Sequence, residues 1–161
     1  MSDGATTPVR IALVGCGRIS RNHFEAIAKI DELQLVAVCD AVEARAREAG
    51  VREDVPWFTS YSRMLEHAPC DVVAVCTPSG LHPQHGMLAA RAGKHVVCEK
   101  PMAITLTSAD DLVQACDDAG VQLFVVKQNR LNPPIQMLKR AIDKGRVGRL
   151  YMANTTARAM R

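Results

Sequence analysis

Short, almost continuously apolar runs alternate along the chain with longer segments in which apolar residues recur every three or four positions. The short runs are rich in β-branched residues, a pattern typical of parallel strands covered on both faces. The longer segments are typical of amphipathic helices. The predicted strands are Val9–Val14, Leu35–Cys39, Trp57–Thr59, Val72–Cys76, His95–Cys98 and Leu123–Val126. The predicted helices are Arg18–Ile30, Val42–Ala49, Ser62–His67, Pro83–Ala92 and Ser108–Ala119.

The alternation of strands and helices at this spacing predicts an α/β fold with an open parallel sheet. Its most probable form on pattern alone is the doubly wound, Rossmann-type dinucleotide-binding sheet. Glycines at 50, 93 and 120 are expected to follow helices, and Thr105 or Thr107 can cap the last one. Ligands of such sheets bind beyond the carboxyl ends of the strands, where the strand order reverses. The loops that follow the strands are therefore the place to look for chemistry.

The first of these loops is VGCGRIS, which follows a strand and opens a helix. Gly15 permits a tight turn, and Gly17 leaves room for the backbone to approach a diphosphate. Backbone N–H groups at the helix start, around Arg18 and Ile19, can then hold that anion. Ser20 stands at the third small position of the fingerprint. The alternative is an ordinary glycine turn, but the position after the first strand favours nucleotide binding.

The second loop begins with Asp40, at the end of LQLVAVCD. A carboxylate there can accept hydrogen bonds from both hydroxyls of the adenosine ribose, and it would repel a 2′-phosphate. Arg45 and Arg47 lie further along the next helix and are interpreted as solvated side chains. NAD is therefore the expected cofactor rather than NADP, and Asp40 can act as a helix cap at the same time.

The loop CTPSGLH follows the fourth strand. Thr77 and Ser79 fall where the chain would cross the diphosphate and the nicotinamide ribose, so both are candidate cofactor-binding residues. His82 is a third candidate, with capping or packing as the alternative. The other histidines, His23 and His85 among them, are interpreted as structural.

The loop CEKPMA follows the fifth strand and would reach the nicotinamide end of the cofactor. Lys100 can hydrogen-bond a substrate hydroxyl there and help to remove its proton as a hydride leaves. Glu99 can orient the lysine amine and lie beside the cofactor, and Pro101 can follow a cis peptide bond. The alternative is a surface ion pair between Glu99 and Lys100.

Composition narrows the class of protein. The 161 residues suffice for a substantial core, and a net charge of +3 without a basic run predicts no nucleic-acid partner. No apolar stretch approaches the roughly 18 residues of a membrane span, so a cytoplasmic protein with no membrane contact is expected. The six cysteines form no CxxC pair and no zinc-ligand cluster. They are interpreted as small buried residues in a reducing compartment, and no metal is expected.

With GCGRIS, VCD, CTPSGLH and CEKPMA in this order, the chain resembles the Gfo/Idh/MocA oxidoreductases. This resemblance implies that Lys100 is catalytic or positions the substrate. A closer resemblance, carried by FVVKQNRLNPPIQMLKRAID and GRVGRLYMANT, is to bacterial dehydrogenases that oxidise the 3-hydroxyl of UDP-N-acetylglucosaminuronic acid. It implies that Gln128 lies at the nicotinamide and that Lys127, Asn129 and Arg130 join Lys100 at the sugar. Solvated loop charges are the alternative for Lys127 and Arg130.

The same resemblance implies a domain order. Residues 1–149 would form the dinucleotide-binding domain, and 150–161 the start of a truncated substrate domain whose first strand is Leu150–Thr156. A full-length relative is expected to be a homo-oligomer. The expected function is hydride transfer from a sugar or sugar-nucleotide hydroxyl to NAD, and the alternative is an NAD-binding module without turnover. A methyltransferase on the same sheet is disfavoured by Asp40 together with the CEKPMA loop.

Overall fold

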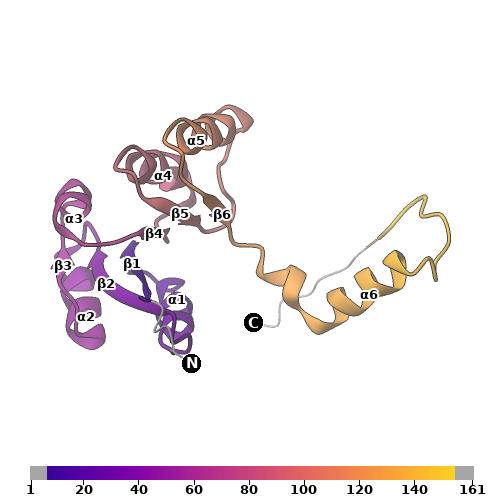
Figure 1. Cartoon of the computed structure of the whole chain (residues 1–161), viewed down its shortest axis with the longest axis horizontal. Coiled ribbons are helices and arrows are strands. Elements are labelled where there is room, and N and C mark those ends of the chain that lie inside the picture. Colours follow the sequence, from indigo (N-terminus) through magenta and orange to yellow (C-terminus); the bar gives the residue numbers. More distant parts are fainter. Residues whose placement is uncertain (1–6, 155–161) are drawn as a thin grey trace, which may run out of the picture. The chain divides into compact units, whose positions relative to one another are not determined.

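The structure is a computed structural model that describes residues 7–154. The chain divides into two compact units, Met1–Val126 and Lys127–Arg161, and each is described by itself. The first unit contains a six-stranded parallel sheet with the strand order β3-β2-β1-β4-β5-β6 (Figure 1). The order reverses between β1 and β4, which confirms the predicted doubly wound sheet and places its switch point beside the glycine loop.

The predicted strands and helices of this unit are all present, with ends shifted by a few residues. The strands are β1 (Val9–Val14), β2 (Leu33–Cys39), β3 (Trp57–Phe58), β4 (Val72–Val75), β5 (His95–Cys98) and β6 (Leu123–Val125). The helices are α1 (Ser20–Ile27), α2 (Glu43–Glu53), α3 (Tyr61–His67), α4 (His82–Arg91) and α5 (Leu106–Asp118), with the short 3-10 helix η1 (Ser79–Leu81) before α4. Thr105 caps α5 by accepting the Ser108 N–H, which settles the choice between the two threonines.

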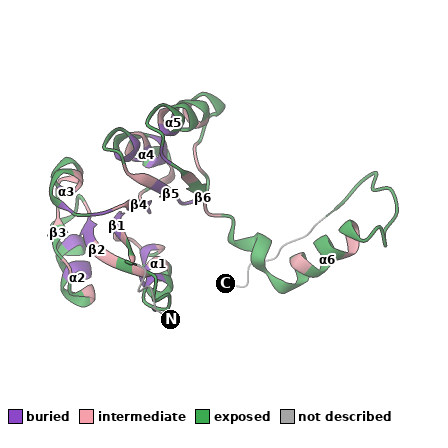
Figure 2. Cartoon of the chain, viewed as in Figure 1, coloured by how far each residue is buried: buried purple, intermediate pink, exposed green. Residues whose placement is uncertain are grey.

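Two hydrophobic cores explain why the strands read as continuous apolar runs. Val73 and Val75 of β4 pack in one core with buried residues of α3, α4 and α5. Val72 and Ala74 of the same strand pack in the other core with α1 and α2. Successive side chains of a strand point to opposite faces, so covering both faces requires every position to be apolar. Figure 2 shows the buried residues concentrated on the central strands and on the sheet-facing sides of these helices.

Gly50 departs from the sequence prediction, because it lies inside α2 rather than after it. A Cβ atom at this position would come within 2.8 Å of Trp57 Cβ and 2.9 Å of the Val55 carbonyl oxygen. The glycine therefore allows α2 to pack closely against β3. The helix ends instead at Glu53 and is followed by Asp54, whose φ of 54° is left-handed.

The second unit contains the 3-10 helix η2 (Gln128–Leu131) and helix α6 (Pro133–Asp143), which the sequence analysis missed. Residues 150–154 of the predicted strand Leu150–Thr156 have no regular structure here, residues 155 and 156 lie outside the described residues, and the predicted start of a substrate domain at residue 150 stays a prediction. An extended segment needs a neighbouring strand for its backbone hydrogen bonds, and residues 150–154 have no such neighbour among residues 7–154. No helix in the described part of the chain is long and apolar enough to cross a membrane.

Candidate functional site

The glycine loop after β1 is shaped by two glycines for different reasons. Gly15 has a φ of 95°, and a Cβ there would lie 2.6 Å from Cys76 C and Thr77 N. Glycine is thus required where this loop touches the loop after β4. A Cβ at Gly17 would meet no atom of the described residues within 4 Å. The protein itself does not explain Gly17, whereas a ligand that approaches the backbone does.

Three successive backbone N–H groups, of Gly17, Arg18 and Ile19, have no hydrogen-bond acceptor among the described residues. They immediately precede α1, where the Ser20 hydroxyl donates to the Gly17 carbonyl oxygen at 2.6 Å. Free N–H groups at the start of a helix bind anions because the helix dipole adds to their partial positive charge. The loop therefore fits the diphosphate of a dinucleotide.

Asp40 follows β2 and has its two carboxylate oxygens on different partners. Oδ2 accepts the Cys16 N–H at 2.9 Å, and Oδ1 accepts the Val42 N–H at 2.8 Å. The carboxylate thus ties the glycine loop to the start of α2, close to the capping role considered from the sequence. Each carboxylate oxygen can accept more than one hydrogen bond, so the half-buried group can also receive ribose hydroxyls.

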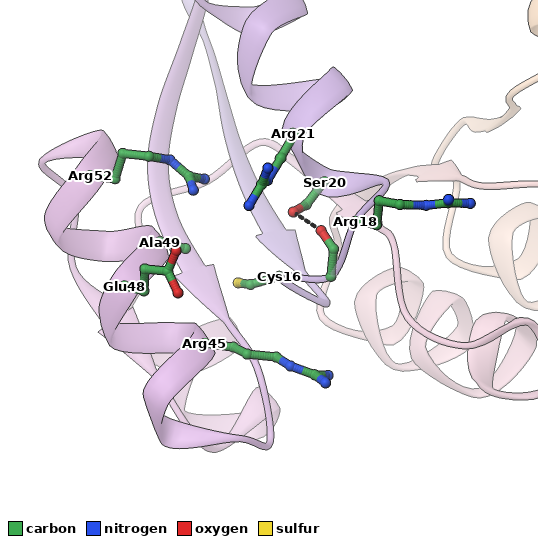
Figure 3. A pocket seen from close by; sticks show the side chains of 9 residues that line it. Cys16, Arg18, Ser20, Arg21, Arg45, Glu48, Ala49 and Arg52 are labelled. Atoms are coloured by element: carbon green, nitrogen blue, oxygen red, sulfur yellow. Dashed lines mark hydrogen bonds between the residues drawn. The ribbon is translucent and has the colours of Figure 1, made fainter.

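A pocket of about 490 Å³ lies between the glycine loop and α2 (Figure 3). Its walls carry four arginines and one glutamate, and the lining residues are Cys16, Gly17, Arg18, Ser20, Arg21, Arg45, Glu48, Ala49 and Arg52. Arg45, interpreted from the sequence as merely solvated, is exposed but reaches into this space from α2. The excess of positive charge favours an anionic ligand beside the glycine loop. Burial, and then the Asp40 charge, raise the pKa of Cys16 to about 12, so its thiol stays neutral.

Two histidines hold the loop that contains Thr77. His85 Nδ1 lies 3.0 Å from the Thr77 hydroxyl oxygen, and burial, followed by the neighbouring His82, lowers the pKa of His85. His82 is only 2% exposed, and its ring nitrogens lie 2.7 Å from the carbonyl oxygens of Thr77 and Pro101. His82 therefore supports two loops from within, which fits the packing alternative, and its predicted contact with the cofactor stays a prediction. Ser79 is half-buried and opens η1.

The loop after β5 places Lys100 at the carboxyl edge of the sheet with an exposed side chain. Its bond to Pro101 is cis, as the sequence analysis allowed. Glu99 is 6% exposed, and its carboxylate accepts the His23 ring N–H at 2.9 Å and the Lys100 backbone N–H at 3.1 Å. Glu99 thus contacts the main chain of Lys100, not its amine as predicted from the sequence.

The remaining candidates belong to the second unit. Lys127, Gln128, Asn129 and Arg130 are exposed, and the last three lie in η2. Their roles at the nicotinamide and the sugar stay predictions.

Residues 9–127 match a protein family described as an oxidoreductase family with an NAD-binding Rossmann fold. The chain belongs to the Gfo/Idh/MocA oxidoreductase family. This membership confirms the resemblance inferred from the four loop motifs and the expectation of NAD as cofactor. Within the described residues, no cluster of three or more histidine, cysteine, aspartate or glutamate side chains could hold a metal ion.

One similar solved structure is that of the WlbA dehydrogenase from Bordetella pertussis in complex with NADH and UDP-GlcNAcA. It is 48% identical to this chain, with a TM-score of 0.87, and the match covers 89% of this chain and 44% of that one. WlbA of Chromobacterium violaceum, with the same ligands, is 44% identical with a TM-score of 0.89, over 91% of this chain and 43% of that one. D-apiose dehydrogenase of Paraburkholderia graminis is 38% identical, over 92% of this chain and 40% of its own. The chain thus spans less than half the length of these relatives.

The structure adds two candidate site residues of this Gfo/Idh/MocA chain, His23 and His85. The sequence alone led to an interpretation of both as structural. His23 contacts Glu99 across 76 positions of the chain, and His85 contacts Thr77. His85 lies eight residues from Thr77, on the helix that follows the same loop. For His23, no local pattern could have indicated the partner.

Proposed function

We propose that this chain is the NAD-binding part of an oxidoreductase that transfers a hydride from a sugar-nucleotide hydroxyl to NAD. The observation that carries the proposal is the pairing of free N–H groups in the glycine loop with an exposed lysine at the same edge of one parallel sheet. The first fits a diphosphate, and the second lies two strands away, on the other side of the switch point.

The roles of the chain's own residues follow from these positions. The glycine loop holds the diphosphate, Asp40 accepts the ribose hydroxyls, and Thr77 and Ser79 line the path toward the nicotinamide. The bound cofactor supplies a hydride acceptor. Lys100 hydrogen-bonds the substrate hydroxyl and accepts its proton while the carbon gives up its hydride, so that a carbonyl group forms.

The substrate we propose is UDP-N-acetylglucosaminuronic acid, and the group that is oxidised is its 3-hydroxyl. Support comes from the two WlbA structures, which contain NADH and UDP-GlcNAcA and are 44% and 48% identical to this chain. Lys127, Asn129 and Arg130 would contribute cations and an amide for an anionic sugar, and Gln128 would contact the cofactor. In the sequence these four residues follow β6 after one intervening residue, Val126.

The test is a titration with NADH, followed by an absorbance assay for NADH formed from NAD and the UDP-sugar. Lys100→Met should retain NAD affinity and lose turnover, because the lysine acts on the substrate. The matched control is Lys94→Met, which lies at the opposite end of β5 and should change neither quantity. Absence of NAD binding would refute the proposal. Tight NAD binding without substrate-dependent NADH would support the alternative, an NAD-binding module without its own turnover.

A further inference from the structure

Glu99 is a buried carboxylate at the end of β5, and no lysine or arginine pairs with it among the ion pairs of the described residues. Burying a carboxylate is unfavourable unless its oxygens are hydrogen-bonded. Here each oxygen has a different partner: Oε1 accepts from His23 Nε2, and Oε2 accepts from the Lys100 backbone N–H. The carboxylate therefore joins a helix to the main chain of the lysine itself.

The helix in question is α1, the one that follows the glycine loop. His23 lies one turn after Ser20, whose hydroxyl binds the Gly17 carbonyl. Phe24 and Ile27, at 4% and 8% exposure, anchor the same helix in the core. The His23 ring thus projects from a fixed support that begins at the diphosphate site.

We propose that His23 is a positioning residue for Lys100, and that it acts through Glu99 to set the lysine loop against the phosphate-binding helix. This inference rests on the function proposed above for Lys100. When the glycine loop holds the diphosphate, the cofactor is bound at the start of the same anchored helix, and the His23–Glu99 contact then holds the lysine loop in register with the nicotinamide. Without that contact the cofactor would still bind, but the lysine loop would no longer be held in register with it.

The experiment measures how fast an amine-acylating reagent modifies Lys100, with peptide mass spectrometry as the readout, in the presence and absence of saturating NAD. Lys100 is exposed, so the reagent reaches it in the free protein. Lys94, at the other end of β5, serves as the internal reference. In the wild type, NAD should slow the modification of Lys100 about tenfold relative to Lys94, within the range of coupling energies for residues in one hydrogen-bonded network.

Two substitutions at position 23 form a matched pair. Glutamine places an amide N–H near the position of the histidine Nε2, whereas the shorter asparagine places it near Nδ1 and cannot reach Glu99. His23→Gln should retain the NAD-dependent protection of Lys100. His23→Asn should lose it even though NADH titration shows that the cofactor still saturates the site. A purely structural role would lower the melting temperature without separating binding from protection.

The outcomes distinguish the two proposals. Equal protection of Lys100 in the wild type, His23→Gln and His23→Asn overturns the role of His23 and leaves the proposed function standing. If NAD fails to protect Lys100 in the wild type, the placement of Lys100 at the nicotinamide is refuted, and this inference with it. Should His23→Asn not fold, Glu99→Met replaces it: the thioether side chain has no carboxylate oxygen for either His23 or the Lys100 N–H, and retained protection of Lys100 would overturn the proposal.

Discussion

Replacing each of the two glycines of the loop by alanine separates folding from cofactor binding. At Gly17 the added methyl group meets no protein atom within 4 Å, and the backbone is not left-handed. Gly→Ala at a compatible position changes the free energy of unfolding by less than about 1 kcal/mol, usually in the stabilising direction. We therefore expect Gly17→Ala to fold as well as the wild type.

The same methyl group would occupy the space in which a diphosphate approaches the free N–H groups. A hydrogen bond to a charged group contributes about 1.5–3 kcal/mol. If the methyl group displaces the diphosphate from one N–H, the dissociation constant for NAD should rise by roughly 10- to 150-fold, at about 1.4 kcal/mol per factor of ten.

Gly15→Ala should behave in the opposite way. Its φ of 95° costs a non-glycine residue about 1–3 kcal/mol. The added Cβ would also lie 2.6 Å from backbone atoms of Cys76 and Thr77, which cannot rotate away. Overpacking of this kind costs typically about 1–3 kcal/mol more. At about 2–4 °C per kcal/mol for a chain of this size, the melting temperature should fall by about 5–20 °C.

Thermal and urea unfolding followed by circular dichroism measure the stability of both variants, and NADH fluorescence measures binding. A folded Gly17→Ala protein that binds NADH like the wild type would refute the placement of the diphosphate on this loop. A Gly15→Ala protein as stable as Gly17→Ala would refute the argument from the close approach to Cys76 and Thr77.

Two further predictions concern carboxylates. Arg10 donates its backbone N–H and two guanidinium N–H groups to Asp71, which holds the pKa of Asp71 at about 2. The resulting stabilisation of the folded state is complete above pH 3.8, the ordinary pKa, and is lost as the pH falls toward 2. Asp71→Asn should lower the free energy of unfolding by about 1 kcal/mol at neutral pH, since the pair is partly exposed. Urea titrations at several pH values should show that the stability of this variant falls less steeply than that of the wild type as the pH is lowered toward 2. Asp40→Ser should weaken NADH binding about tenfold. It should also raise the affinity for NADPH relative to NADH, because the carboxylate that would repel a 2′-phosphate is removed while Arg18 and Arg45 remain. An unchanged ratio would contradict a role of Asp40 in cofactor choice.

The sheet could be predicted because burial on both faces leaves a direct trace in the sequence. Every residue of Val72–Val75 must be apolar when two cores meet at β4, and the same holds for the buried segment Ile11–Val14 of β1. Helix ends were less predictable. Gly50 reads as a terminator, but the close packing of α2 on Trp57 is a tertiary requirement with no local signal.

Helix α6 was missed for a different reason. Its apolar positions Ile135, Leu138 and Ile142 recur at helical spacing, but Pro133 and Pro134 precede them and read as a loop. Proline is well tolerated in the first turn of a helix, where its missing N–H has no acceptor to lose. The prolines in fact begin α6.

Candidate residues that act through their own loop could be named from the sequence, because the end of a parallel strand fixes where they lie. Residues that join one loop to another could not. The contacts of His82 with the Thr77 and Pro101 carbonyls, and of His23 with Glu99, connect the loops after β4 and β5 and the helix after β1. An imidazole suits this task, since it carries two hydrogen-bonding nitrogens at separate corners of a rigid ring. The loop that carries Lys100 is therefore supported by side chains from helices α1 and α4, and the CEKPMA motif alone does not specify where the lysine amine lies.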